Sequence, residues 1–172
     1  DKEKDHKYDR VIFFLENNQK LIYNDVRKFG FIKLLKRYQI NSCKHLKKLG
    51  PEPLEKNCNT QYFKKYISGR KRNIKNILMD QKCISGLGNI YVNEILFESN
   101  IKPTRKVSNL KNFEIDKIIF NTKKILNKSI KLGGSSIKNF SSNNGKKGAF
   151  QQYFKVYGRK GEKCSNIDCN MT

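Results

Sequence analysis

A glycine-rich turn that runs directly into an apolar helix is the feature that most constrains this chain. Residues 84–97 read ISGLGNIYVNEILF. Gly86 and Gly88 have no Cβ, so the backbone at these positions can approach a ligand closely. Asn89 is expected to be the N-cap of the helix, and the apolar residues after it form the face that is buried. The free N–H groups at such a helix start favour an anion.

The charge of the chain indicates which anion this is. The formal net charge is +22, from 37 Lys and Arg against 15 Asp and Glu. This surplus favours a polyanionic partner, and nucleic-acid phosphate is the first candidate. The alternative is compositional bias, because Lys, Asn and Ile are abundant throughout, as an AT-rich genome would produce. Nucleic acid is favoured because glycine-rich turns and aromatic residues interrupt the basic stretches, whereas no basic amphipathic helix indicates a membrane surface.

The first part of the chain predicts β-structure. Residues 10–16 and 19–25 are rich in β-branched and aromatic side chains, and Asn17-Asn18 between them suits a tight hairpin turn. Residues 31–35 are a candidate third strand. Three short strands form a poor independent domain, so we expect them to complete a sheet whose other strands lie before residue 1.

Beyond the proline- and glycine-containing stretch 49–54 the pattern becomes helical. Helices are expected at residues 62–67, 74–79, 89–99 and 110–132. Gly133-Gly134 is expected to end the longest of them. A polar loop at 141–148 and a strand at 151–157 complete the predicted elements.

Two basic motifs are candidates for contacts with nucleic acid. Residues 24–30 (NDVRKFG) place Phe29 near Arg27, as a protein needs in order to wedge into a base stack. The alternative, which the residues alone favour, is a core Phe beside a solvated basic pair. The run 69–72 (GRKR) is either a phosphate contact or a solvated loop, and its position before the glycine-turn helix favours phosphate slightly.

The cysteines indicate a metal site rather than disulfides. Five cysteines at scattered spacing, with no signal peptide, favour a reducing compartment. Cys164 and Cys169 form half of a zinc site whose second pair would lie past Thr172, so the chain as given is expected to bind zinc weakly or not at all. Two unrelated thiols are the alternative. The other three cysteines are interpreted as structural or incidental thiols.

Catalytic groups are scarce by contrast. His6 and His45 are isolated, no paired carboxylates stand out, and the lysines are too numerous for one to be chosen as a nucleophile. The residues by themselves therefore indicate a basic, zinc-containing protein that binds DNA or RNA.

The same segments, in the same order, resemble the formamidopyrimidine-DNA glycosylase family, bacterial base-excision repair enzymes for oxidised purines. The matching stretches are 24–30 (NDVRKFG), 49–54 (LGPEPL), 78–97 (LMDQKCISGLGNIYVNEILF), 133–140 (GGSSIKNF) and 148–164 (GAFQQYFKVYGRKGEKC). The resemblance implies an α+β fold. Residues 1–50 would be the last strands of the N-terminal β-sandwich catalytic domain, and residues 51–140 a helix-two-turn-helix DNA-binding domain. Residues 141–172 would be the lesion-capping loop and the start of a β-hairpin zinc finger.

The resemblance also implies a function. Such an enzyme flips 8-oxoguanine or a formamidopyrimidine out of double-stranded DNA, excises it, and cleaves the abasic site by β,δ-elimination through a Schiff base. Arg27 would face the orphaned base, and Phe29 would wedge beside it. Lys71 and Asn89 would hold backbone phosphates. Tyr8 stands where the family commonly has a DNA-contacting His.

The remaining expectations concern the metal, the ends of the chain and the setting. By resemblance, Cys164 and Cys169 would be the first two ligands of a structural Zn²⁺. The family's nucleophile, an N-terminal proline followed by a glutamate, would lie before Asp1, so this chain alone is expected to be inactive. We expect a monomeric bacterial protein without a membrane segment, cytoplasmic and associated with the nucleoid.

Two other functions remain open from the sequence. One is an endonuclease VIII-like glycosylase for oxidised pyrimidines, and the other is a non-catalytic zinc-ribbon protein that binds nucleic acid. The Phe-rich capping segment and the LGPEPL linker favour the oxidised-purine enzyme over the first of these.

Overall fold

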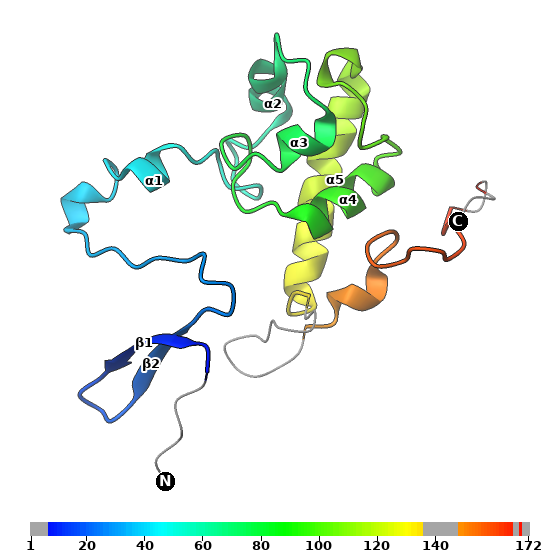
Figure 1. The fold of residues 1–172 in the computed structure, drawn as a ribbon. Coiled ribbons are helices and arrows are strands. Elements are labelled where there is room, and N and C mark those ends of the chain that lie inside the picture. Colours follow the sequence, from blue (N-terminus) through cyan, green and yellow to red (C-terminus); the bar gives the residue numbers. More distant parts are fainter. Residues whose placement is uncertain (1–6, 136–147, 167–168, 170–172) are drawn as a thin grey trace. The chain divides into compact units, whose positions relative to one another are not determined.

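The structure is a computed structural model that describes residues 7–135, 148–166 and 169. The chain divides into two compact units, Asp1–Ser42 and Cys43–Thr172. Figure 1 shows the β-hairpin of the first unit and the helices of the second. The domain boundaries expected at residues 50 and 140 stay predictions.

The first unit is built on an antiparallel hairpin. Strand β1 (Asp9–Phe14) pairs with β2 (Lys20–Asn24). In the turn, the Leu15 N–H donates to the Gln19 carbonyl over 2.9 Å, and Asn18 adopts a left-handed φ of 60°. Asn tolerates this backbone region better than most residues, which explains why the turn forms here. The predicted hairpin is confirmed.

The third strand expected at residues 31–35 is wrong. In the described part of the chain the sheet has two strands, and 31–35 continues as irregular chain before the 3₁₀ helix η1 (Arg37–Gln39). Apolar side chains suit a strand, but a strand also needs a neighbouring edge with which to exchange hydrogen bonds. The sequence pattern reports the first requirement and not the second.

The second unit is helical. It contains α1 (Lys44–Lys47), α2 (Thr60–Ile67), α3 (Ile74–Leu78), α4 (Asn89–Glu98), η2 (Val107–Asn109), α5 (Asn112–Lys131) and η3 (Phe150–Tyr153). Helix α5 contacts α2 and α4, and α3 contacts α4 (Figure 1). Phe63, Ile77, Leu96 and Ile118, one from each of these four helices, are fully buried in a shared core. The four predicted helices are confirmed.

Two glycines end α5 as expected. Gly133 and Gly134 have φ values of 73° and 81°, and the Gly134 N–H donates to the Ser129 carbonyl over 2.8 Å. The chain returns to this point at Gly148, where a Cβ would lie 2.2 Å from the Gly134 carbonyl oxygen. Glycine is therefore required at this close approach. Most of the loop predicted at 141–148, which the resemblance interprets as lesion-capping, lies outside the described residues.

The strand expected at residues 151–157 is also wrong. This segment begins in η3 and continues as turns. Phe150 is buried and stacks on Tyr91 at 5.8 Å, while Phe154 meets the Phe150 ring edge-on at 5.7 Å. The aromatic residues recur every three to four positions, which is the spacing of helical turns and not of a strand.

None of the helices in the described ranges combines the length and the apolar character needed to cross a membrane.

Candidate nucleic-acid interface

A single carboxylate folds the loop that follows β2. Asp25 Oδ1 accepts hydrogen bonds from the N–H groups of Arg27 (3.0 Å) and Lys28 (2.9 Å), and Oδ2 accepts one from Gly30 (2.8 Å). These donors, the Gly30 N–H first, lower the pKa of Asp25 below its ordinary value. Lys28 takes a left-handed φ of 56° inside the loop. Asp25 thus fixes the backbone from which two candidate side chains project.

Those two side chains, Arg27 and Phe29, stack on each other in solvent. The Arg27 guanidinium carbon lies 4.6 Å from the centroid of the Phe29 ring, and Phe29 is 77% exposed. The alternative reading of Phe29 as a core residue is therefore wrong for this unit. An exposed cation–π pair contributes about 0.5–1 kcal/mol, enough to favour one arrangement of the two side chains. Aromatic rings and guanidinium planes are also the groups on which bases stack.

Tyr8 lies at the same end of the hairpin. Its backbone carbonyl accepts the Asp25 N–H over 3.0 Å. Gly30 closes the loop against Tyr23, whose hydroxyl would lie 1.5 Å from a Cβ at position 30. The backbone of Tyr8 is thus joined to the Asp25 loop, which carries Arg27 and Phe29.

In the helical unit, the cations of the basic run 69–72 differ in whether they have a partner within the chain. Arg70 donates from Nε to the Tyr66 carbonyl over 2.6 Å and stacks on that ring at 4.4 Å. Arg72 pairs with Asp80 at 3.1 Å. Lys71, between them, is exposed and makes no hydrogen bond or ion pair with any described residue. Lys71 is therefore the member of the run available to an external phosphate.

The glycine-rich turn before α4 is held by Gln81, a residue that the sequence analysis missed. Gln81 Oε1 accepts the Gly86 N–H over 2.7 Å, and Nε2 donates to the Leu87 carbonyl over 2.9 Å. The Gly86 N–H is thus already used inside the turn, so the groups left for an anion are those of the helix start itself. A flexible side chain can reach around a turn in ways that no local spacing rule reveals.

The N-cap of α4 is Gly88 rather than Asn89, so that prediction is corrected by one residue. Gly88 has φ −117° and ψ 176°, and its carbonyl accepts the Val92 N–H over 3.0 Å. Asn89 is the first helical residue and is exposed. No side chain among the described residues caps this end, which leaves the N–H groups of the first turn, at the positive end of the helix, for an external acceptor.

Lys71 and Asn89 are connected by the interactions just described. The Arg72–Asp80 ion pair joins the segment that carries Lys71 to the segment that follows α3. Gln81 follows Asp80 directly and fastens the glycine-rich turn that ends at Asn89. A free ammonium and an uncapped helix start are thus supported by one chain of hydrogen bonds. Phosphate is the anion that both groups suit.

Glu94 is the second functional residue that the sequence analysis missed. It is 4% exposed, and its carboxylate accepts the backbone N–H groups of Lys155 (2.8 Å), Val156 (3.1 Å) and Tyr157 (2.9 Å). This residue docks the segment that leads to Cys164 onto α4. The signal was a single carboxylate among the apolar residues of the predicted helix, since a buried charge requires partners.

Cys164 and Cys169 line one cavity of about 250 Å³ together with Lys155, Arg159 and Lys163. Two thiols fit zinc in type, but they are half of a tetrahedral set. Residues 7–135, 148–166 and 169 contain no group of three or more His, Cys, Asp or Glu side chains that could hold a metal ion. The two cysteines line the same cavity, the described residues do not complete a zinc site, and the zinc site stays a prediction.

The other cysteines are buried, and Cys83 shows what burial does to their chemistry. Burial raises the pKa of Cys83 to about 12. A thiol with such a pKa stays protonated at neutral pH and is a poor nucleophile or metal ligand. This supports the interpretation of Cys83 as a structural thiol.

Comparison with known proteins extends this picture beyond single residues. Residues 49–141, more than half of the chain, match the family model described as the formamidopyrimidine-DNA glycosylase H2TH domain. A curated relative, formamidopyrimidine-DNA glycosylase of a Ruegeria species, is 39% identical over 166 residues, which are 96% of this chain and 59% of the relative.

Solved structures agree with the sequence relatives. The crystal structure of the MutM (Fpg) protein of Thermus thermophilus superimposes with a TM-score of 0.89 at 29% identity, covering 98% of this chain and 63% of that one. A Lactococcus lactis FPG mutant, in complex with a Fapy-dG-containing DNA, gives 0.88 at 36% identity, covering 96% and 60%. The chain thus spans roughly three fifths of the proteins it matches. With the H2TH domain matched over residues 49–141, the chain belongs to the formamidopyrimidine-DNA glycosylase family.

Proposed function

We propose that this chain is the DNA-binding part of a base-excision repair enzyme that removes oxidised purines from double-stranded DNA. The substrates are 8-oxoguanine and formamidopyrimidines, and the abasic site left behind is cleaved by β,δ-elimination. The observation that carries this proposal is the exposed Arg27–Phe29 stack on the Asp25 loop. A planar pair held on a folded loop can occupy the gap that an extruded base leaves in a duplex.

Each site residue then has a separate role. Phe29 fills the gap beside the orphaned base, and Arg27 offers guanidinium donors to that base. Tyr8 contacts DNA from the same end of the hairpin. Lys71 and Asn89 hold backbone phosphates, which position the duplex without reading its sequence.

The covalent step is assigned to a residue outside these 172. In the family, the amine of an N-terminal proline attacks the sugar C1′ and the bond to the damaged base breaks; the C1′–O4′ bond then opens, leaving a hydroxyl at C4′ and a Schiff base at C1′. We therefore propose that this chain binds lesions without excising them. Borohydride reduces a Schiff base to a stable adduct, so incubation with 8-oxoguanine DNA and borohydride should leave the chain unmodified. A covalent adduct would contradict this part of the proposal.

Zinc is assigned a structural role. Cys164 and Cys169 would provide two thiolates, and a tetrahedral site requires two further ligands. The ion would hold the segment around these cysteines in one conformation and would supply no chemistry to the reaction.

A binding experiment tests the role of the stack. The chain should prefer a duplex with a tetrahydrofuran abasic analogue over the intact duplex, measured by fluorescence anisotropy. Phe29→Ala should remove most of that preference. Phe14→Ala is the matched control, because Phe14 is also exposed in the same hairpin and lies under the Lys20 ammonium at 5.8 Å. Equal losses in the two variants would contradict the proposal.

The choice of lesion needs the full-length protein. Excision of 8-oxoguanine in preference to thymine glycol is the expected result. The reverse preference would assign the protein to oxidised pyrimidines.

A further inference from the structure

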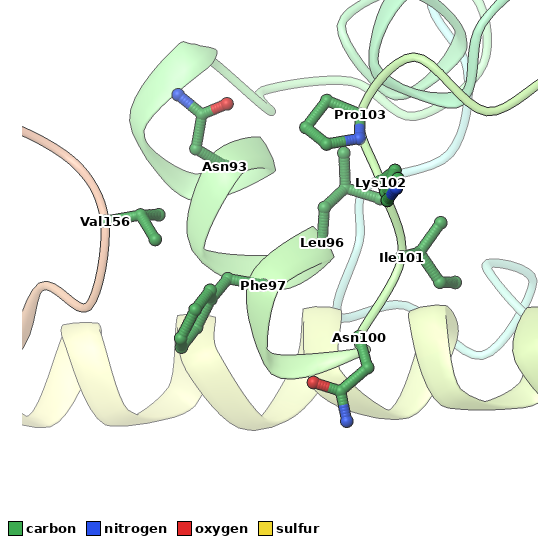
Figure 2. Close-up of a pocket in the computed structure, with 8 residues that line it drawn as sticks. All are labelled: Asn93, Leu96, Phe97, Asn100, Ile101, Lys102, Pro103 and Val156. Carbon is green, nitrogen blue, oxygen red and sulfur yellow. The ribbon is translucent and has the colours of Figure 1, made fainter. Parts of the chain in front are cut away.

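A cavity of about 490 Å³ opens beside the C-terminal half of α4. Figure 2 shows Asn93, Leu96 and Phe97 projecting from this helix, with Val156 on a separate segment beside it. Asn100, Ile101, Lys102 and Pro103 complete the lining. None of the DNA-contacting or metal-binding residues assigned above is among them. The volume is in the range of small-molecule sites, about 300–1,000 Å³.

The walls of the cavity are apolar and its polar groups are few. Leu96 and Ile101 are buried, while Phe97, Pro103 and Val156 retain exposed surface. Water next to such surface is displaced favourably by an apolar ligand. Flat, ring-containing molecules suit walls that are formed by a phenyl ring, a proline ring and branched aliphatic side chains.

The polar groups indicate the charge of the ligand. Lys102 is exposed, and its ammonium makes no ion pair or hydrogen bond with any described residue. The amides of Asn93 and Asn100 add donors, and the lining contains no carboxylate. In a chain of net charge +22, an uncompensated lysine at an apolar cavity selects an anion.

We propose that this cavity binds a small aromatic carboxylate, with the ring against Leu96, Phe97 and Val156 and the carboxylate at Lys102. The proposal does not depend on DNA binding by the chain. A bound ligand would add to the restraint on the segment around Val156, whose N–H already donates to Glu94. The site would therefore link a small molecule to the segment that leads to Cys164.

The probe is 1-naphthoate, followed by ¹H–¹⁵N NMR on the 172-residue chain. Saturable shifts are expected at the amides of Asn93, Ile101, Lys102 and Val156. The dissociation constant expected for a ligand of this size is on the order of 1 mM. Neutral 1-naphthamide should bind about threefold more weakly or worse, because it lacks the charge that Lys102 attracts.

Two variants test separately what the ring and the carboxylate of the ligand contribute to binding. Val156→Trp should fill the cavity and weaken naphthoate binding about tenfold or more, because the ring then has no space. Lys102→Gln should remove the preference for naphthoate over naphthamide. Lys117→Gln removes an exposed lysine on α5, outside the cavity, and should keep that preference. Unchanged amide shifts in the α2–α5 core confirm that each variant is folded.

Three outcomes would overturn the proposal. The first is the absence of saturable shifts, or shifts spread over lysines in general. The second is naphthoate binding that Val156→Trp leaves unchanged. The third is saturation by N-acetyltryptophanamide and not by naphthoate, which would assign the cavity to an aromatic side chain of a protein partner.

Discussion

Single carboxylates organise the backbone at several places in the described part of this chain. Asp25 folds the loop after β2, and Glu94 docks the segment 155–157. Glu114 caps the start of α5, because its Oε2 accepts the Lys111 N–H over 2.7 Å while Oε1 pairs with Arg105 at 2.6 Å. The Lys111 N–H is the main reason that the pKa of Glu114 is lowered. In a chain with so many cations, these acidic residues bind main-chain donors instead of surface lysines.

The Asp25 loop should depend on pH in a specific direction. The folded pKa of Asp25 is lowered, so the loop is stabilised above the ordinary Asp pKa and loses this stabilisation as the pH falls through the folded pKa. The Gly30 amide proton, followed by NMR, should titrate with a midpoint below 3.8. Asp25→Asn should abolish this transition. A midpoint at or above 3.8 would show that the carboxylate does not hold the loop.

Lys71 and Arg72 are adjacent but should behave differently. Lys71→Gln should reduce the slope of log affinity for duplex DNA against log salt by about one, without changing the melting temperature. Arg72→Gln should lower the melting temperature, because it breaks the ion pair with Asp80. Salt titrations by anisotropy, together with thermal melting, distinguish the two effects. An unchanged salt slope in Lys71→Gln would remove Lys71 from the phosphate contacts.

At the scale of elements, α4 combines three tasks along ten residues. Its uncapped start carries Asn89, its buried face carries Glu94, and its last turns border the cavity of Figure 2. The apolar residues between these positions pack against α5 and α3. A shift of α4 would therefore move the proposed phosphate contact and the docked segment together.

Glu94→Gln should release the docked segment. The amide keeps the shape of the side chain but replaces one acceptor oxygen with a donor that faces backbone N–H groups. We expect a cost of about 2–3 kcal/mol in the free energy of unfolding. Hydrogen exchange at Val156 and Tyr157 should accelerate, while exchange in the α5 core should not.

Glu98→Gln is the matched control for this prediction. Glu98 lies one turn further along α4 and pairs with Lys124 at 2.8 Å, but both side chains are partly exposed. Its loss should cost less than about 1 kcal/mol. Equal effects of the two substitutions would mean that Glu94 is no more than a surface charge.

At the scale of the whole molecule, the sequence predicted local structure better than long-range contacts. The hairpin turn at Asn18 and the stop at Gly133 depend on backbone preferences of nearby residues, and both are confirmed. The DNA-contacting role of Phe29 came from the resemblance and stays a prediction, while the exposure of its ring could not be read from composition. The partners of Glu94 lie 61–63 residues away, so no local pattern could identify them.

Removing metal should leave the helical unit intact. Its core is formed by residues such as Phe63 and Ile118, which are fully buried, whereas Cys164 and Cys169 are half-buried and line a separate cavity. Thermal melting of this chain with and without EDTA should therefore give the same midpoint. Cys164→Ser should also melt at that temperature. A fall of several degrees in either case would show that zinc contributes to the stability of this unit.

The three bonds made by Glu94 have a genetic consequence. Its partners are peptide N–H groups, which are present whatever residues other than proline occupy positions 155–157. A defect caused by replacing Glu94 therefore has no reciprocal charge swap that could repair it. Suppressor selection should recover reversion at codon 94 far more often than second-site changes in the docked segment. This contact therefore constrains the residue at position 94 but leaves the side chains at positions 155–157 free to vary.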